Sequence, residues 1–122
     1  MAGIMEQAKE LGHALARTEE YKTLRRALKD ADDDREIAEA RSTLERLEGS
    51  IAASLRAGQD PPKEEAEEYQ TTVGRLERNA TYQRLVAAQA NFEKIIKKVN
   101  ATIEQGMEEG ADSRIILPGM GG

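Results

Sequence analysis

The chain lacks the residues on which several classes of protein site depend. It contains no cysteine and no tryptophan, and only one phenylalanine and one histidine occur among its 122 residues. Without cysteine, disulfides, thiolate metal sites, cysteine nucleophiles and cysteine-held iron–sulfur clusters are excluded. Aromatic residues make up 3% of the chain and hydrophobic residues 39%, so a thick globular core is hard to assemble. The length fits a single domain.

Long apolar runs and an excess of positive charge are also missing. No stretch approaches the ~20 apolar residues that a membrane-spanning helix needs. The first residues, which include Glu6 and Glu10, do not have the pattern of a signal peptide. The formal net charge of −5 argues against electrostatic binding to nucleic acid or to anionic membrane. We therefore expect a soluble cytoplasmic protein that does not contact a membrane.

The composition that remains favours long helices. Ala, Glu, Lys, Leu and Arg dominate the sequence, and these are the residues that form helices best. Apolar residues recur at steps of three and four, which places them on one face of a helix. The expected fold class is all-α, a helical hairpin or bundle of about five helices. We place this single domain at residues 1–110 and a non-helical tail with glycine and proline at residues 111–122.

The clearest pattern lies in the middle of the chain. Asp33 and Glu36 have the spacing of a capping box. After them comes a coiled-coil-like row of about three heptads, formed by Ile37, Ala40, Leu44, Leu47, Ile51 and Leu55. We expect Gly58 to end this helix and Pro61 and Pro62 to begin the next one. That next helix repeats the apolar row with Ala66, Tyr69, Val73 and Leu76.

One short pattern occurs twice. A small polar residue is followed by Tyr, Leu and Ala at steps of three, as Thr18, Tyr21, Leu24 and Ala27 and again as Asn79, Tyr82, Leu85 and Ala88. Thr and Asn are favoured N-caps, so we interpret the two stretches as equivalent helix starts at two joints of a helical hairpin. The alternative is chance, because N-caps and helical periodicity make such matches common. Nothing recurs a third time, so a solenoid repeat is not supported.

The stretches "RTEEYKTLRRALKDADDDREIAEA", "GQDPP" and "NATYQRLVAAQANFEKIIKKVNATI" together resemble the YlbF/YmcA family of small bacterial helical regulators. The resemblance covers residues 4–103 and rests on the order of helices and turns. It implies a self-associating adaptor without enzymatic activity, whose partners are other bacterial regulatory proteins. It also implies roles in sporulation, competence, biofilm formation and RNA processing. Cysteine-held iron–sulfur clusters, linked to some members, cannot be carried over, because the chain has no cysteine.

No group of residues in the sequence suggests catalysis, a metal site or a cofactor site. His13 falls two residues from Leu11 and Leu15 of an apolar row, so we expect it to be an ordinary surface residue. The acidic run at residues 30–34 lacks the mid-loop glycine of a calcium loop and is better explained by helix capping. We therefore expect neither enzyme activity nor a cofactor.

Two basic clusters suggest an alternative function, RNA binding. They consist of Lys22, Arg25, Arg26 and Lys29, and of Lys94, Lys97 and Lys98. Base stacking would need exposed aromatic side chains beside them, but Tyr21 and Phe92 lie on the apolar rows. Residues 31–78 carry thirteen acidic and seven basic groups, and an acidic segment with basic flanks can pair subunits in a fixed register. Protein association is therefore favoured, and an RNA-binding accessory role through residues 22–29 and 94–98 is the alternative.

The apolar rows of a lone hairpin predict a homodimer or a higher oligomer. Leu47, Ile51, Val73 and Leu76 would stay partly in water, and burying each such side chain stabilises by ~1.5–3 kcal/mol. The expected interface and packing residues are Tyr21, Leu24, Leu44, Leu47, Ile51, Val73, Leu76, Tyr82, Leu85, Phe92, Ile96 and Val99.

Two expectations concern the end of the chain. We expect residues 44–51 to pack against residues 92–99, with Phe92 the position least tolerant of truncation. In the tail, Ile115, Ile116 and Leu117 form a candidate docking segment for a partner's groove. The alternative for the tail is a solvated terminus.

Overall fold

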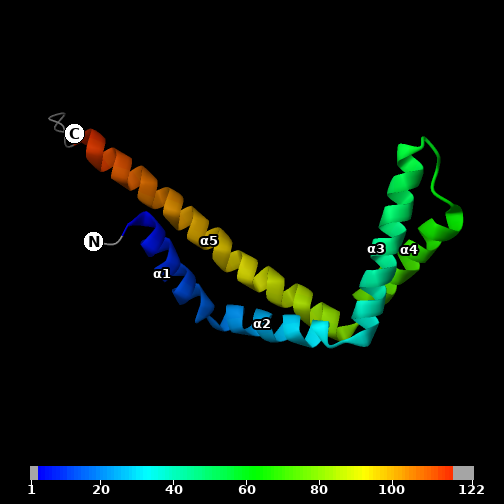
Figure 1. Ribbon diagram of the computed structural model, residues 1–122. Helices are drawn as coiled ribbons and strands as arrows, with labels where there is room; N and C mark the ends of the chain where they lie inside the picture. Colours follow the sequence, from blue (N-terminus) through cyan, green and yellow to red (C-terminus); the bar gives the residue numbers. More distant parts are fainter. Residues whose placement is uncertain (1–2, 117–122) are drawn as a thin grey trace. The chain divides into compact units, whose positions relative to one another are not determined.

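The computed structural model describes residues 3–116, with side chains for residues 3–111. It contains five α-helices, α1 (Ile4–Ala16), α2 (Glu19–Asp32), α3 (Arg35–Arg56), α4 (Lys63–Glu77) and α5 (Ala80–Ile116). No strand occurs within these residues, so the all-α prediction is confirmed. The chain divides into two compact units, Met1–Gln89 and Ala90–Gly122. Within the first unit, α3 and α4 lie side by side as a hairpin (Figure 1).

The two copies of the repeated pattern both begin a helix. The backbone N–H of Tyr21 donates to Thr18 Oγ1 at 3.2 Å at the start of α2. The backbone N–H of Tyr82 donates to Asn79 Oδ1 at 2.9 Å at the start of α5. Each cap satisfies one of the amide groups that the first turn of a helix leaves without a partner. The sequence interpretation of Thr18 and Asn79 as equivalent N-caps is therefore confirmed.

The same two copies also meet in the core of the first unit. This core consists of buried residues from α2, α3, α4 and the first turns of α5, namely Ala27, Ala31, Ile37, Ala40, Leu76, Leu85 and Ala88. Leu24, Leu44 and Tyr82 pack against it and remain half-buried. The repeated Leu and Ala positions thus supply Leu24, Ala27, Leu85 and Ala88. Four of the seven buried core residues are alanines, so each contributes little apolar volume to this core.

The boundary between α2 and α3 differs from the prediction by one residue. Asp34, not Asp33, caps α3, because its Oδ1 accepts the backbone N–H of Ile37 at 2.9 Å. Asp33 is instead the C-cap of α2, and its backbone N–H donates to the carbonyl of Lys29 at 3.1 Å. Four aspartates within residues 30–34 offer several equivalent caps.

The connection from α3 to α4 follows the sequence prediction. Gly58 has a φ of +73°, a conformation that residues with a Cβ seldom adopt. Its N–H donates to the carbonyl of Leu55 at 3.0 Å, and the N–H of Gln59 donates to the carbonyl of Ser54 at 2.9 Å. This pair of bonds is the Schellman motif that commonly ends a helix at glycine. The two prolines then precede α4, whose first turn contains Glu64 and Glu65, and both carboxylates interact favourably with the helix dipole.

The last helix extends further than the sequence suggested. We expected the non-helical tail to begin at residue 111, whereas α5 continues to Ile116. Gly106 and Gly110 each cost about 1 kcal/mol relative to alanine in a helix, but neither forces a helix to end. Pro118 disfavours the helical conformation of the residue before it, so the sequence contains no strong stop before that point. Leu117 and the side chains of Ile115 and Ile116 lie outside the described residues.

Candidate interaction surface

Polar side chains join α3 to α4 along the length of the hairpin. The Arg46 guanidinium donates to Glu68 at 3.0 Å, and the Ser50 hydroxyl lies 2.8 and 2.9 Å from the two carboxylate oxygens of Glu65. An exposed ion pair such as Arg46–Glu68 contributes only about 0–1 kcal/mol. These contacts therefore fix the register of the two helices more than they stabilise the fold.

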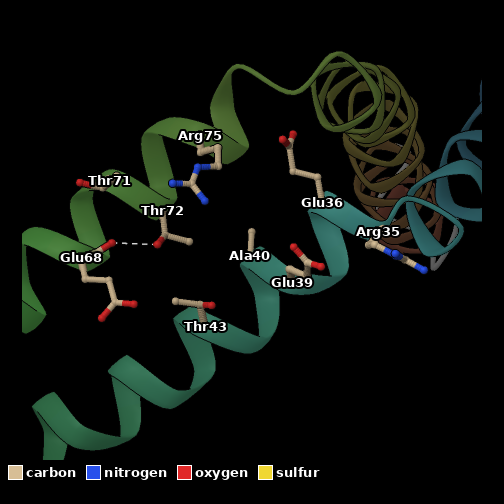
Figure 2. A pocket seen from close by; sticks show the side chains of 9 residues that line it. All are labelled: Arg35, Glu36, Glu39, Ala40, Thr43, Glu68, Thr71, Thr72 and Arg75. Atoms are coloured by element: carbon tan, nitrogen blue, oxygen red, sulfur yellow. Dashed lines mark hydrogen bonds between the residues drawn. The ribbon is translucent and has the colours of Figure 1, made fainter.

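One side of the hairpin carries a cleft of about 400 Å³ that we name the polar cleft. Its lining residues are Arg35, Glu36, Glu39, Ala40, Thr43, Glu68, Thr71, Thr72 and Arg75. Ala40 and Thr72 point toward each other across the gap between α3 and α4 (Figure 2). The hydroxyl of Thr72 donates to the backbone carbonyl of Glu68 at 2.8 Å, so this buried hydroxyl is already satisfied within its own helix. The cleft offers mixed charge and no unpaired buried group.

A second hollow of about 330 Å³ lies nearer the α3–α4 turn, and we name it the apolar groove. It is lined by Glu48, Ile51, Ala52, Leu55 and Tyr69. Leu55 is 61% exposed, although it belongs to the apolar row of α3. The Tyr69 hydroxyl donates to a Glu48 carboxylate oxygen at 3.2 Å. This hydrogen bond and the negative charge of Glu48 raise the pKa of Tyr69 above its ordinary value of 10.0.

The described residues offer no arrangement suited to metal binding. They contain no cluster of three or more His, Cys, Asp and Glu side chains that could hold a metal ion. His13 is exposed on α1, as the sequence predicted. In the part of the chain that the structure describes, no helix is both long enough and apolar enough to cross a membrane.

Both basic clusters are exposed, but their surroundings differ from those of a base-stacking surface. The Nζ atom of Lys22 lies 3.9 Å from a carboxylate oxygen of Glu19. The Nζ atom of Lys97 lies 3.9 Å from a carboxylate oxygen of Glu93. Among residues 3–111, every Tyr and Phe side chain is at least partly buried. Single-stranded nucleic acid is bound by combining cations with open aromatic faces, whereas Tyr21 and Phe92, which neighbour these clusters in the sequence, are half-buried.

The twelve predicted interface and packing residues separate into three groups. Leu47, Leu76 and Leu85 are buried, so the expectation that Leu47 and Leu76 stay partly in water was wrong. Tyr21, Leu24, Leu44, Ile51, Val73 and Tyr82 are half-buried in the first unit. Phe92, Ile96 and Val99 are half-buried in the second unit. The pairing of residues 44–51 with residues 92–99 stays a prediction.

Sequence reasoning missed the residues that connect α3 to α4. Arg46, Ser50, Glu65 and Glu68 were not singled out, because helical periodicity identifies the polar face without pairing its members. Their pairing depends on the register of the hairpin. The positions of Gly58 and the two prolines were the sequence signal from which that register could be counted.

The five helices of the described residues, with the α3–α4 hairpin, define a small all-helical fold. The sequence profile of one family matches residues 4–108, and its description is control of competence regulator ComK, YlbF/YmcA. The chain belongs to this YlbF/YmcA family. No curated protein sequence matches it.

Among solved structures, the chain is similar to one in the X-ray crystal structure of Bacillus subtilis RicA in complex with RicF. The TM-score is 0.78, and the match covers 88% of this chain and 96% of that chain. Sequence identity is 16%, so the likeness is one of fold.

Proposed function

We propose that the chain is a non-catalytic helical adaptor that regulates other bacterial proteins by binding them. The observation that carries this proposal is the apolar groove, in which Leu55, at the end of the apolar row of α3, is 61% exposed beside Ile51 and the ring of Tyr69. Exposed apolar patches beside a polar rim are typical of protein–protein contact sites.

The comparisons support the same class of function. The family's description names control of the competence regulator ComK, and the similar solved structure contains RicA bound to RicF. By analogy, this chain acts within a regulatory assembly in which its partner is another protein. The isolation experiment described below identifies the regulator that the chain binds.

Self-association is the second part of the proposal. Ile4 and Met5 of α1 are 78% and 80% exposed, and Ile103 and Met107 of α5 are exposed as well. Burying side chains of this size contributes ~1.5–3 kcal/mol each, which favours a homodimer with coiled-coil-like contacts. Sedimentation velocity over a range of concentrations tests this directly. A monomer at micromolar concentration would rule the homodimer out.

The adaptor function is tested by isolating the chain with its partners. The tagged protein is expressed at its native level in the bacterium that encodes it, purified after nuclease treatment, and weighed by native mass spectrometry. We expect a complex whose mass equals that of the chain plus a whole number of copies of a second polypeptide. A homo-oligomer alone, or a complex that nuclease dissolves, would contradict the proposal.

A further inference from the structure

The part of α5 that belongs to the second unit carries an apolar side. Its aliphatic side chains recur at helical spacing and are half-buried or exposed, namely Ile95, Ile96, Val99, Ile103 and Met107. Met107, at the end of this row, is 62% exposed. Gly106 follows Val99 by about two helical turns and so lies on the same side, and a Cβ added there would meet nothing within 4 Å. Open space therefore lies along this apolar side of α5.

The charges along the same stretch change sign near Val99. From residue 90 to residue 98, three lysines outnumber the single acid Glu93, whose carboxylate lies 3.9 Å from Lys97. These lysines form the lysine segment, Lys94, Lys97 and Lys98. From residue 99 to residue 111 each charged residue is a glutamate, and these form the glutamate segment, Glu104, Glu108 and Glu109. Asp112 and Arg114 follow with opposite charges. Positive charge thus accompanies one end of the apolar side and negative charge the other.

We propose that α5 pairs antiparallel with α5 of a second copy of the chain, with Val99 of each copy opposite Ile103 of the other. In this register Ile95 lies opposite Met107, so the contact extends over ~18 Å of helix. The same register sets the lysine segment of each copy level with the glutamate segment of the other. The inference rests on the self-association proposed above and adds its surface, its direction and its register.

The pattern of α5 selects a second copy as the occupant. A two-fold contact brings identical surfaces together, so the surface must complement itself. α5 does so twice in one register, because Ile96 lies opposite the open space at Gly106 and the lysine segment meets the glutamate segment. A helix of another protein would have to complement α5, but it would not require α5 to complement itself.

The order of the charges also sets the direction of the pair. In a parallel pair the lysine segments of the two copies would lie side by side, and so would the glutamate segments. Like charges brought together across an interface disfavour the pairing. In the antiparallel pair opposite charges approach each other at both ends of the contact, so the antiparallel direction is favoured.

Exchanging the charges of the two segments tests this direction. The lysine variant combines Lys94→Glu, Lys97→Glu and Lys98→Glu, and the exchanged variant adds Glu104→Lys, Glu108→Lys and Glu109→Lys. Sedimentation velocity of the full chain measures the dimer dissociation constant. We expect the lysine variant to raise that constant at least about tenfold, because glutamates then face glutamates at both ends. The exchanged variant should return it to within about threefold of the wild-type value and should not form mixed dimers with the wild-type chain.

A matched control makes the same change of charge on another helix. It combines Lys22→Glu, Arg25→Glu and Arg26→Glu, all exposed on α2. This control should leave the dissociation constant within about twofold of the wild-type value. Circular dichroism compares the helicity of every variant with that of the wild type.

Single cysteines test the register, because the chain has none of its own. Val99→Cys with an affinity tag is mixed with untagged Ile103→Cys under mild oxidation, and mass spectrometry measures the disulfide-linked products. A disulfide needs Cβ atoms ~3.5–4.5 Å apart, whereas the two copies of position 99 are offset by ~6 Å along the helix. We therefore expect the mixed product to exceed the sum of the two self-linked products about threefold. Ala101→Cys is the control, since position 101 is exposed and lies on the opposite side of α5 by helical spacing.

Four results would overturn the inference. An exchanged variant that prefers the wild-type chain to itself would show a parallel pair. A mixed product no more abundant than the Ala101→Cys product would show that the contact lies elsewhere, and so would equal effects of the lysine variant and its matched control. Preferential linkage of Val99→Cys to a Leu55→Cys chain would place α5 in the apolar groove of the second copy.

These failures differ from a failure of the proposed function. Each of the four results leaves a dimer and the adaptor role standing, whereas a wild-type monomer at micromolar concentration removes the self-association on which the inference rests. Should the lysine variant lose helicity, the cysteine variants decide alone, because they change no charge.

Discussion

The side-chain amide of Asn79 donates a hydrogen bond to Glu36 Oε1 at 2.7 Å. The same side chain uses its carbonyl oxygen to cap α5 at the backbone N–H of Tyr82. Glu36 lies in the first turn of α3. One residue thus starts a helix and connects it to the beginning of another helix that is distant in the sequence. Thr18, the equivalent cap of α2, forms a local hydrogen bond instead. Its hydroxyl donates to the backbone carbonyl oxygen of Leu15 at 2.7 Å.

This difference predicts unequal effects of removing the two caps. Thr18→Ala should lower the free energy of unfolding by about 1 kcal/mol, the usual effect of losing an N-cap. Asn79→Ala should lower it by about 1–2 kcal/mol, because the bond to the charged Glu36 is lost as well. Thermal or urea unfolding followed by circular dichroism measures both. Equal losses would show that the Asn79–Glu36 bond contributes nothing.

A second prediction concerns the core. Leu47 is fully buried on α3, so Leu47→Ala should cost ~2–5 kcal/mol. From the sequence we expected Phe92 to be the least tolerant position, but Phe92 is half-buried, whereas the largest fully buried side chains are Ile37, Leu47 and Leu85. We now expect Phe92→Ala to be the milder change in chemical denaturation. A larger loss from Phe92→Ala would show that the second unit has the more tightly packed contacts.

The sequence predicted the helices well because their signals are local. The caps Thr18 and Asn79, the stop at Gly58 and the prolines before α4 each act through neighbouring backbone groups. The same sequence predicted Leu47 and Leu76 to be partly exposed, because periodicity gives the apolar side of a helix but not the residues that cover it. The apolar groove could not be located for the same reason. Leu55 and Ile37 belong to one row, yet Leu55 is exposed and Ile37 is buried.

Replacing Gly58 or Gly49 of the hairpin by alanine should change the free energy of unfolding in opposite directions. Gly58→Ala places a Cβ at a φ of +73°, which should destabilise by about 1–2 kcal/mol. Gly49→Ala lies inside α3, where an added Cβ meets nothing within 4 Å, so it should stabilise by about 0.5–1 kcal/mol. Urea unfolding of the two variants checks both signs. A stabilising Gly58→Ala would contradict the Schellman ending of α3.

The hydroxyl of Tyr69 should titrate at a higher pH in the wild type than in a variant without the Glu48 carboxylate. Glu48 raises the pKa of Tyr69 above 10.0 by hydrogen bonding and by its negative charge. Because the raised pKa favours the protonated form in the folded state, the resulting stability is present below pH 10.0 and is lost as pH rises through the folded pKa. Carbon-13 NMR of the tyrosine ζ carbons in the wild type and in Glu48→Ala measures the shift. An unchanged midpoint would show that the two side chains do not interact in solution.

Crosslinking inside the cell distinguishes a chain that works by contacting other proteins from one that does not. A photo-crosslinking amino acid is placed at Ala52 in the apolar groove, at Thr71 in the polar cleft and at the exposed His13 of α1. We expect light to link the Ala52 position to a second polypeptide in the native bacterium, with higher yield than at the Thr71 or His13 position. Crosslinks from all three positions to nucleic acid, or to no other protein, would contradict this expectation.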